Sequence, residues 1–142
     1  MWAAAFLQSS NGYGETKIMA GKILIVDDCK TYRALLKAWL GNSFEFIEAS
    51  SAEEAFEILK TEHPDCMVLD NFLPGQLGYV FIHRLNKSLL VNLPPTALLS
   101  GNVDPTLDRQ AKSVGASEVM DKNKITQDSF IKMINSLMLK AA

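Results

Sequence analysis

Short apolar runs alternate along the chain with segments in which apolar residues recur at helical spacing. The segment at residues 22–27, K-I-L-I-V-D, is apolar at four consecutive positions. A continuous run of this length is typical of a strand that is buried on both faces of a sheet. The whole pattern predicts five strands, at residues 22–27, 44–48, 65–70, 96–100 and 117–121.

A helix is predicted after each of these strands. The first helix is followed by Gly41, which suits a C-terminal cap. Capping residues or a proline break mark the ends of the others. They are expected from Ser50 or Ser51 in a capping box with Glu53 or Glu54, over residues 77–87 after a loop at residues 71–75, from Asp104 to about Val114, and from Thr126. One apolar face of the first helix contains Tyr32, Leu35, Leu36, Trp39 and Leu40.

Strand followed by helix, five times over, predicts an α/β fold with a parallel sheet covered by helices on both faces. Right-handed crossovers leave few arrangements, and we expect the strand order 2-1-3-4-5. The 142 residues fit one domain with its own core. We predict that domain over residues 21–142, after a flexible extension over residues 1–20 in which Met19 is an alternative start.

Composition and charge give no reason to expect a nucleic-acid or membrane partner. The chain is 48% hydrophobic and 21% charged, with a net charge of −2. Its apolar runs are shorter than the ~20 residues of a membrane span. The two cysteines, Cys29 and Cys66, form no disulfide framework. We expect reduced, buried thiols, which favour a cytoplasmic location.

Carboxylates follow two of the predicted strands. Asp27 and Asp28 end the first strand, and Asp70 ends the third. The carboxyl ends of parallel strands face a common crevice, and these two strands are neighbours in the expected order. Converging carboxylates repel one another and need a cation to compensate them. An all-oxygen site with open positions suits Mg²⁺, with Mn²⁺ as an alternative.

A hydroxyl and an ammonium group occupy the ends of the last two strands. Ser100 ends the fourth strand, and Lys122 follows the fifth. Around one divalent cation, these groups and the acids would form a site for phosphoryl transfer. The cation and the lysine would neutralise phosphoryl oxygens while one carboxylate attacks phosphorus in line.

In this order, the residues resemble the response-regulator receiver domain, the phosphoacceptor component of bacterial two-component signalling. The spacing of 30 residues from Asp70 to Ser100 and of 22 from Ser100 to Lys122 agrees with that family. The resemblance covers about residues 22–140 and implies a flavodoxin-like three-layer sandwich, similar to single-domain chemotaxis regulators. The matching segments are D27-D28, D70-N71-F72-L73-P74-G75 with Gly78, L98-L99-S100-G101, and G115-A116 with Lys122.

The resemblance implies a role for each acidic residue. Asp70 is identified as the phosphorylated aspartate, and Asp28 as a direct Mg²⁺ ligand beside it. The main-chain carbonyl of Phe72 is implied as a further metal ligand. Asp27 is implied to bind the ion largely through water or to help hold the site together.

The switching residues match the family only in part. Ser100 corresponds to the switch hydroxyl, and Lys122 to the ion-pair partner of the phosphoryl group. Val119 stands where the family usually has Tyr or Phe, which puts aromatic-coupled switching in doubt. Asn123 stands where the family usually has a proline with a cis peptide bond. A non-proline cis bond costs ~3 kcal/mol, so we expect a trans peptide here and an altered loop.

The leading hypothesis is a phosphorylation-dependent switch rather than an enzyme, catalysing only its own phosphorylation and dephosphorylation. The resemblance implies a sensor histidine kinase or a histidine phosphotransfer protein as donor. It also implies a downstream protein that binds the face made by the fourth helix, fifth strand and fifth helix. No contact with nucleic acid or membrane is expected, and homodimerisation is left open.

Two other classes of function are weighed against it. The receiver fold could serve as an unphosphorylated docking or dimerisation module, which Val119 and Asn123 favour and the full set of site residues opposes. Aspartate-nucleophile hydrolases instead carry a D-x-D-x-T pattern after the first strand. Here Cys29 stands in place of the second aspartate of that pattern, which argues against such a hydrolase.

Overall fold

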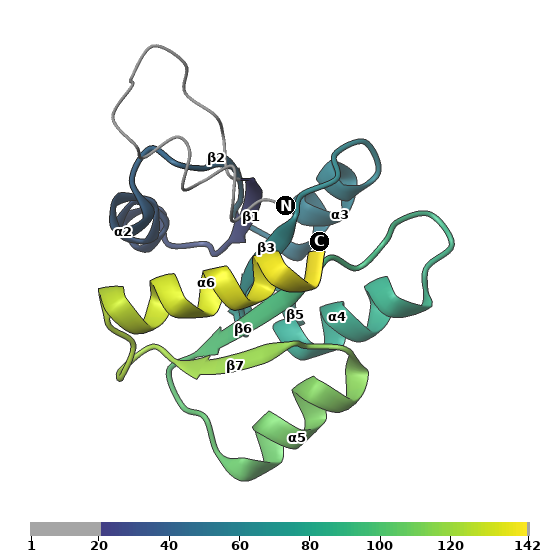
Figure 1. Ribbon diagram of the computed structural model, residues 1–142. Helices are drawn as coiled ribbons and strands as arrows, with labels where there is room; N and C mark the ends of the chain where they lie inside the picture. Colours follow the sequence, from purple (N-terminus) through teal and green to yellow (C-terminus); the bar gives the residue numbers. More distant parts are fainter. Residues whose placement is uncertain (1–20, 142) are drawn as a thin grey trace.

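Five parallel strands form the central sheet of the computed structural model, which describes residues 21–141 (Figure 1). Their order is β2-β1-β3-β6-β7, which confirms the predicted order 2-1-3-4-5. The predicted extension over residues 1–20 lies outside the described residues. The five strands are β1 (Lys22–Val26), β2 (Glu45–Ala49), β3 (Cys66–Asp70), β6 (Thr96–Ser100) and β7 (Glu118–Asp121).

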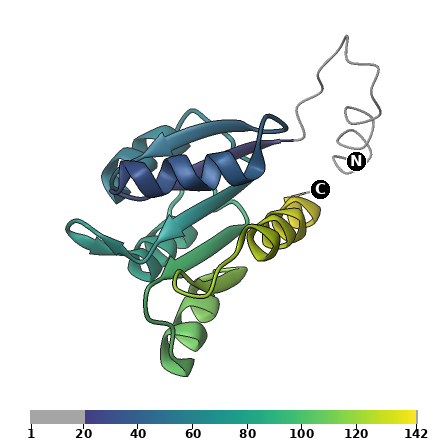
Figure 2. The same cartoon turned by 90° about the vertical axis from the view of Figure 1, so that its left-hand side faces the viewer.

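Helices cover both faces of the sheet, as Figures 1 and 2 show. One face carries α2 (Lys30–Leu40) and α6 (Gln127–Ala141). The other carries α3 (Ala52–Leu59), α4 (Gly78–Lys87) and α5 (Pro105–Val114). The predicted doubly wound α/β sandwich is therefore confirmed.

The alternation of side chains along each strand divides the core into two clusters. On β1, Leu24 and Val26 pack toward α3, α4 and α5, whereas Ile23 and Ile25 pack toward α2 and α6. All four side chains are fully buried. Burial on both faces explains why the sequence of this strand is continuously apolar rather than alternating.

The predicted helix caps are present. Ser51 caps α3 by accepting a hydrogen bond from the main-chain N–H of Glu54 at 3.1 Å, which decides between the two alternatives for this cap. The carboxylate of Glu54 in turn accepts from the N–H of Ser50 at 2.7 Å. Asp104 and Thr126 each accept a hydrogen bond from the N–H three residues on, at the starts of α5 and α6.

Two local expectations were wrong. The segment after β3 is not a plain loop but a hairpin of β4 (Phe72–Leu73) and β5 (Gln76–Leu77). Its turn is Pro74-Gly75, where proline fixes one φ angle and Gly75 adopts a φ of 78°. Leu35 is 40% exposed rather than buried, because it lies about 100° around α2 from Leu36, which faces the sheet.

The two cysteines lie in opposite environments, so the expectation that both are buried was wrong for Cys29. Cys29 is the exposed N-terminal cap residue of α2, and Cys66 is buried in β3. Burial raises the pKa of Cys66 to about 12. We therefore expect the thiol of Cys29 to react quickly with a soluble disulfide reagent at neutral pH, and the thiol of Cys66 to react only after unfolding. A Cys29→Ser variant should lose the fast phase, and a fast phase that survives this change would contradict the assignment.

An ion-pair cluster joins the edge of the sheet to α2. The carboxylate of Glu48 on β2 accepts hydrogen bonds from Arg33 at 2.8 Å and from Lys37 at 2.7 Å. Arg33 also donates to the main-chain carbonyl of Asp27 at the end of β1. These contacts tie the start of α2 to the strand end that carries the acids.

This cluster predicts a pH dependence of stability. The hydrogen bonds from Lys37 and then Arg33 lower the pKa of Glu48 below its ordinary value of 4.5. Its contribution is therefore complete above about pH 4.5 and is lost as the pH falls through the lowered value. The side chain of Glu48 is a third exposed, so we expect its ion pairs to contribute less than about 1 kcal/mol to the free energy of unfolding. In urea unfolding, the deficit of Glu48→Gln should shrink between neutral pH and about pH 3; a constant deficit would contradict this.

Candidate functional site

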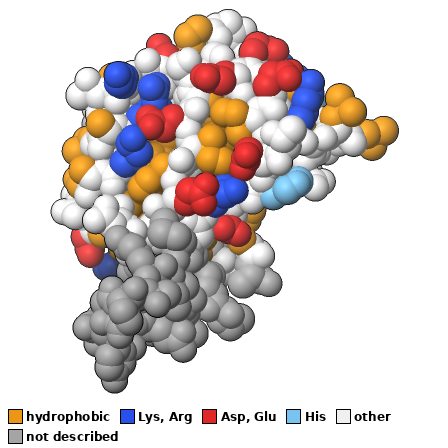
Figure 3. Space-filling model, turned by 90° about the horizontal axis from the view of Figure 1, so that it is seen from above, with side chains coloured by type: hydrophobic (Ala, Val, Ile, Leu, Met, Phe, Trp, Pro, Cys, Tyr) orange, Lys and Arg blue, Asp and Glu red, His pale blue; other side chains and the backbone are white. Residues whose placement is uncertain are grey.

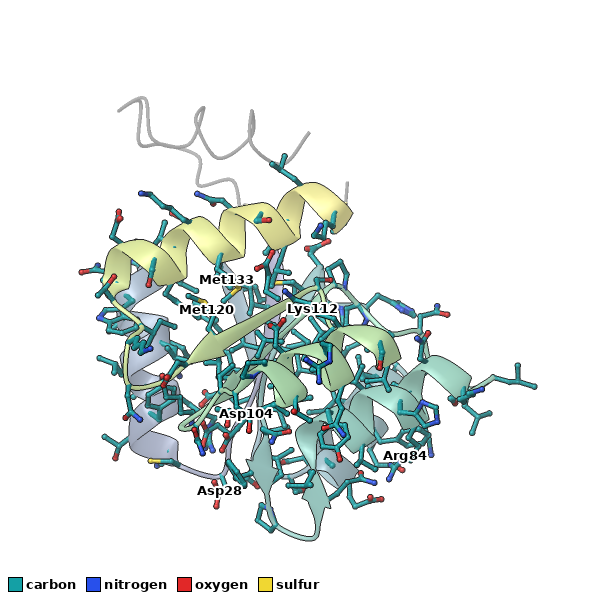
Figure 4. The ribbon with its side chains drawn as sticks, turned by 90° about the horizontal axis from the view of Figure 1, so that it is seen from below. Asp28, Arg84, Asp104, Lys112, Met120 and Met133 are labelled. Atoms are coloured by element: carbon teal, nitrogen blue, oxygen red, sulfur yellow. The ribbon has the colours of Figure 1, made fainter. Side chains whose placement is uncertain are left out.

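Three carboxylates converge at the carboxyl ends of β1 and β3. One oxygen of each of Asp27, Asp28 and Asp70 lies within 4.8 Å of the others. Asp27 and Asp70 are 3% and 6% exposed, whereas Asp28 is exposed and points outward from the molecule in Figure 4. The site thus has two buried acids and one that is open to solvent.

The ammonium group of Lys122 lies between the two buried acids. Its Nζ is 2.7 Å from Oδ2 of Asp27 and 3.4 Å from Oδ1 of Asp70. Burial alone would lower the pKa of Lys122, but the hydrogen bond to Asp27 and the two negative charges outweigh it and raise the pKa. Oδ1 of Asp27 accepts from the N–H of Cys29 at 2.8 Å, so both carboxylate oxygens of Asp27 have partners.

Asp70 is the less well compensated of the two buried acids. Burial raises its pKa, and the charge of Asp27 raises it further. Lys122 and a 3.2 Å hydrogen bond from the N–H of Phe72 act in the opposite direction without cancelling that rise. A buried carboxylate whose charge is only partly compensated is stabilised by any additional positive charge that enters the site.

The geometry and chemistry of these groups fit a magnesium ion. The donors are carboxylate oxygens from two adjacent strand ends. Because Asp28 is exposed, an ion from solvent can reach the cluster on its side. Hard oxygen donors with room for water are the ligands that Mg²⁺ prefers. Phe72 opens β4 directly after Asp70 and Asn71, so its peptide group lies beside the same cluster.

Ser100 lies at the end of β6, next to β3 in the sheet. It is fully buried, and its hydroxyl exchanges hydrogen bonds with the main chain of Asn102 at 3.2 and 3.3 Å. Its carbonyl accepts from the N–H of Lys122 at 2.8 Å. The hydroxyl is therefore held by its own loop, and the main chain of Ser100 positions the lysine.

Asn123 provides contacts that a proline could not. Its side-chain amide donates to the carbonyl of Gly101 at 2.7 Å, and its main-chain N–H donates to the carboxylate of Asp121 at 2.8 Å. The described residues contain no cis peptide bond, which confirms the expected trans peptide after Lys122. Val119 packs against the cluster beneath α3, α4 and α5. Asn123 thus ties the loop after β6 to the loop after β7.

Two residues at the site were not anticipated. Asn71 is 3% exposed, and its side-chain oxygen accepts from the N–H of Tyr79 at 3.1 Å, which joins the end of β3 to the start of α4. The N-cap residue of α4 is Leu77, so the contact from Asn71 depends on how the chain folds back after β3, and no local capping pattern in the sequence marked it. The ring of Tyr32 lies 4.2 Å from Nζ of Lys122. The helical pattern marked Tyr32 only as a core residue.

The described residues add three further observations. On the face in Figure 3, Lys and Arg side chains lie among Asp and Glu side chains. Within residues 21–141, none of the helices combines the length and the apolar character that crossing a bilayer requires. In Figure 4, Met120 and Met133 lie between α6 and the sheet, where they form part of the core rather than of the site.

Two curated regulators are similar to this chain in sequence. PhoB, a phosphate regulon transcriptional regulatory protein of Pseudomonas aeruginosa, is 31% identical over 106 residues, which are 73% of this chain and 46% of that protein. SrrA, a transcriptional regulatory protein of Staphylococcus aureus, is 46% identical over 70 residues, or 49% of this chain and 29% of that protein. The chain thus spans less than half the length of either regulator.

Solved structures share the fold. A putative response regulator from Chloroflexus aurantiacus aligns with a TM-score of 0.76 at 26% identity, covering 84% of this chain and 98% of that one. The chemotaxis response regulator CheY4 of Vibrio cholerae aligns with a TM-score of 0.75 at 21% identity, covering 84% and 99%. The sequence model of the response regulator receiver domain matches residues 23–135, most of the chain. This chain belongs to the response regulator receiver domain family.

Proposed function

We propose that this protein is a phosphoacceptor switch that receives a phosphoryl group on Asp70 from a histidine kinase or a histidine phosphotransfer protein. The observation that carries the proposal is the pairing of a poorly compensated, buried Asp70 with a lysine at 3.4 Å and two neighbouring acids. Membership of the receiver family supports it. The protein would act in the cytoplasm and would catalyse only its own phosphorylation and dephosphorylation.

In the proposed reaction, a carboxylate oxygen of Asp70 attacks the phosphorus atom of a phosphohistidine. An oxygen–phosphorus bond forms on Asp70 as the phosphorus–nitrogen bond breaks, and the electron pair of that bond stays on the imidazole. The ammonium group of Lys122, 3.4 Å from Asp70, would move from Asp27 to stabilise the phosphoryl oxygens.

Metal binding would involve the same acids. Asp28 and Asp70 would hold Mg²⁺ directly, together with the main-chain carbonyl of Phe72, and Asp27 would contribute largely through water. Once bound, the ion supplies positive charge to the transferring phosphoryl group. The full engagement of Asp27 by Lys122 and Cys29 is consistent with its indirect role.

The output would follow from the loop after β6. Ser100 would leave the main chain of Asn102 and donate its hydroxyl to the phosphoryl group, which would shift the loop. The surface expected to respond is the face formed by α5, β7 and α6, which corresponds to the predicted fourth helix, fifth strand and fifth helix. A downstream protein would bind there, and a second copy of the chain is left open as that partner.

Intact-protein mass spectrometry tests the proposal. After incubation with acetyl phosphate and Mg²⁺, we expect a single phosphoryl adduct that EDTA prevents and hydroxylamine removes, as an acyl phosphate requires. Fragment masses should place it in the peptide that contains Asp70. A histidine-phosphorylated donor protein should give the same adduct. The proposal fails if neither donor phosphorylates the folded protein.

A second candidate is a receiver fold that docks without phosphorylation. The hydrogen bond from Asn123 to Gly101 favours it, because this contact holds the loop that switching would have to move. Under this reading, the protein would bind its partner equally well with and without acetyl phosphate and Mg²⁺. A change in partner affinity on phosphorylation would exclude it.

A further inference from the structure

The aromatic ring of Tyr32 completes the surroundings of the Lys122 ammonium group. The Nζ atom lies 4.2 Å from the ring centroid, within the range of a cation–π contact. Asp27 and Asp70 contact the same atom at 2.7 and 3.4 Å. The contacts come from three separate elements, since Tyr32 lies on α2 and the acids lie at the ends of β1 and β3.

Core packing alone does not account for a tyrosine here. Its hydroxyl is buried and has no hydrogen-bond partner among the described residues. A buried, unpartnered hydroxyl is destabilising, and phenylalanine would fill the same space without it. Burial raises the pKa of Tyr32, although the charge of Lys122 partly opposes the rise, so the phenol stays neutral. The contact with the lysine is therefore made by the ring.

We propose that Tyr32 is a positioning residue whose ring holds the ammonium group of Lys122 between Asp27 and Asp70. From this position the ammonium group can move to contact the oxygens of a phosphoryl group on Asp70. This inference rests on the proposed phosphoacceptor function. A hydrogen bond to Asp27 favours one position of the ammonium group. The attraction of a ring face depends less on direction, so it persists while the ammonium group shifts toward Asp70.

The kinetic test compares three variants of the full chain. Tyr32→Leu keeps an apolar side chain but removes the ring, and we expect phosphorylation by acetyl phosphate and Mg²⁺ to slow about three- to tenfold. Tyr32→Phe keeps the ring and should restore the rate. Trp39→Leu is the matched control, because Trp39 lies on the same helix, ~10 Å along its axis from Tyr32, and packs against Phe130. It should lower stability and leave the rate unchanged.

Two further measurements separate positioning from a structural effect. In a Lys122→Met background, Tyr32→Leu should no longer slow phosphorylation, because the ring would have no ammonium group to hold. In the unphosphorylated protein, the ε-methylene protons of Lys122 should show an upfield ring-current shift in NMR spectra. That shift should persist in Tyr32→Phe and vanish in Tyr32→Leu.

The outcomes distinguish this inference from the proposed function. A Tyr32→Leu variant that reacts as fast as wild type, or that slows equally with and without Lys122, overturns the positioning role. A wild-type protein that shows the ring-current shift but is not phosphorylated overturns the proposed function and, with it, any role in phosphoryl transfer. Slowing that depends on Lys122 and is rescued by phenylalanine supports both.

Discussion

Replacing Asp70 with asparagine is expected to abolish phosphorylation and, in the absence of Mg²⁺, to stabilise the fold. An amide has the shape of the carboxylate but cannot act as the nucleophile, so the phosphoryl adduct should fall from one to none. Burial and the charge of Asp27 raise the pKa of Asp70, so its ionised form is disfavoured in the folded state. Removing that charge should raise the free energy of unfolding at neutral pH.

The sign of this effect can be checked through its pH dependence. Because folding raises the pKa of Asp70, the folded state binds this proton more tightly than the unfolded state does. The cost of ionisation is absent below the ordinary value of 3.8 and grows as the pH rises through the raised value. The advantage of Asp70→Asn should therefore appear with rising pH in metal-free urea unfolding, and Mg²⁺ should stabilise wild type more than the variant.

A matched change elsewhere controls for the substitution itself. Asp104→Asn is the same chemical change at an exposed helix cap, and asparagine caps helices about as well as aspartate. This variant should be phosphorylated like wild type. An adduct that persists on Asp70→Asn would show that another residue is the nucleophile. A metal-free Asp70→Asn protein that is less stable than wild type would show that the acids are better compensated than their burial implies.

The positions of the acids could be predicted because they depend on topology alone. Continuous apolar runs located the strands, and the order of parallel strands placed the ends of β1 and β3 side by side. Asp27 and Asp28 come directly after β1 and Asp70 is the last residue of β3, so no detail of side-chain conformation was needed to bring them together. The same logic located Ser100 and Lys122 at neighbouring strand ends.

The pairing of these groups could not be predicted, because it depends on side-chain conformation and on loops. Lys122 lies closer to Asp27 than to Asp70. Asn123 was recognised as a departure from proline, but its bond to Gly101 depends on how two loops meet in space. The contact of Tyr32 with Lys122 joins residues far apart in the chain, and helical spacing reports only that Tyr32 faces inward.

Gly78→Ala is expected to destabilise the protein by about 2–3 kcal/mol, because it places a methyl group against the backbone that carries the site. A Cβ atom there would lie 2.7 Å from the carbonyl oxygen of Asp70, 2.8 Å from Cα of Asn71 and 2.8 Å from a methyl carbon of Leu98. The first two neighbours are main-chain atoms, which cannot rotate away. The main-chain N–H of Gly78 also donates to the carbonyl of Asn71 at 2.7 Å. The added methyl group would therefore clash at a point where the two segments already form a hydrogen bond.

The same displacement should slow phosphorylation, because Asp70 and Asn71 would have to move to admit the methyl group. A small misplacement of a reacting group costs ~10–100-fold in rate. Urea unfolding and the acetyl phosphate assay measure the two effects on one variant. Gly101→Ala is the control, since a Cβ atom there has no neighbour within 4 Å. Its stability should stay within about 0.5 kcal/mol of wild type.

Whether Gly78→Ala lowers or raises the stability of the protein shows whether tertiary packing or helix propensity dominates at this position. Gly78 is the first residue of α4, and alanine is favoured over glycine within helices by about 1 kcal/mol. If helix propensity decided the outcome, Gly78→Ala would stabilise the protein and leave Asp70 undisturbed. Loss of stability together with slower phosphorylation would instead show that the start of α4 packs directly against the end of β3. Glycine is then required at this position because it lets α4 approach the strand that carries the proposed phosphoacceptor.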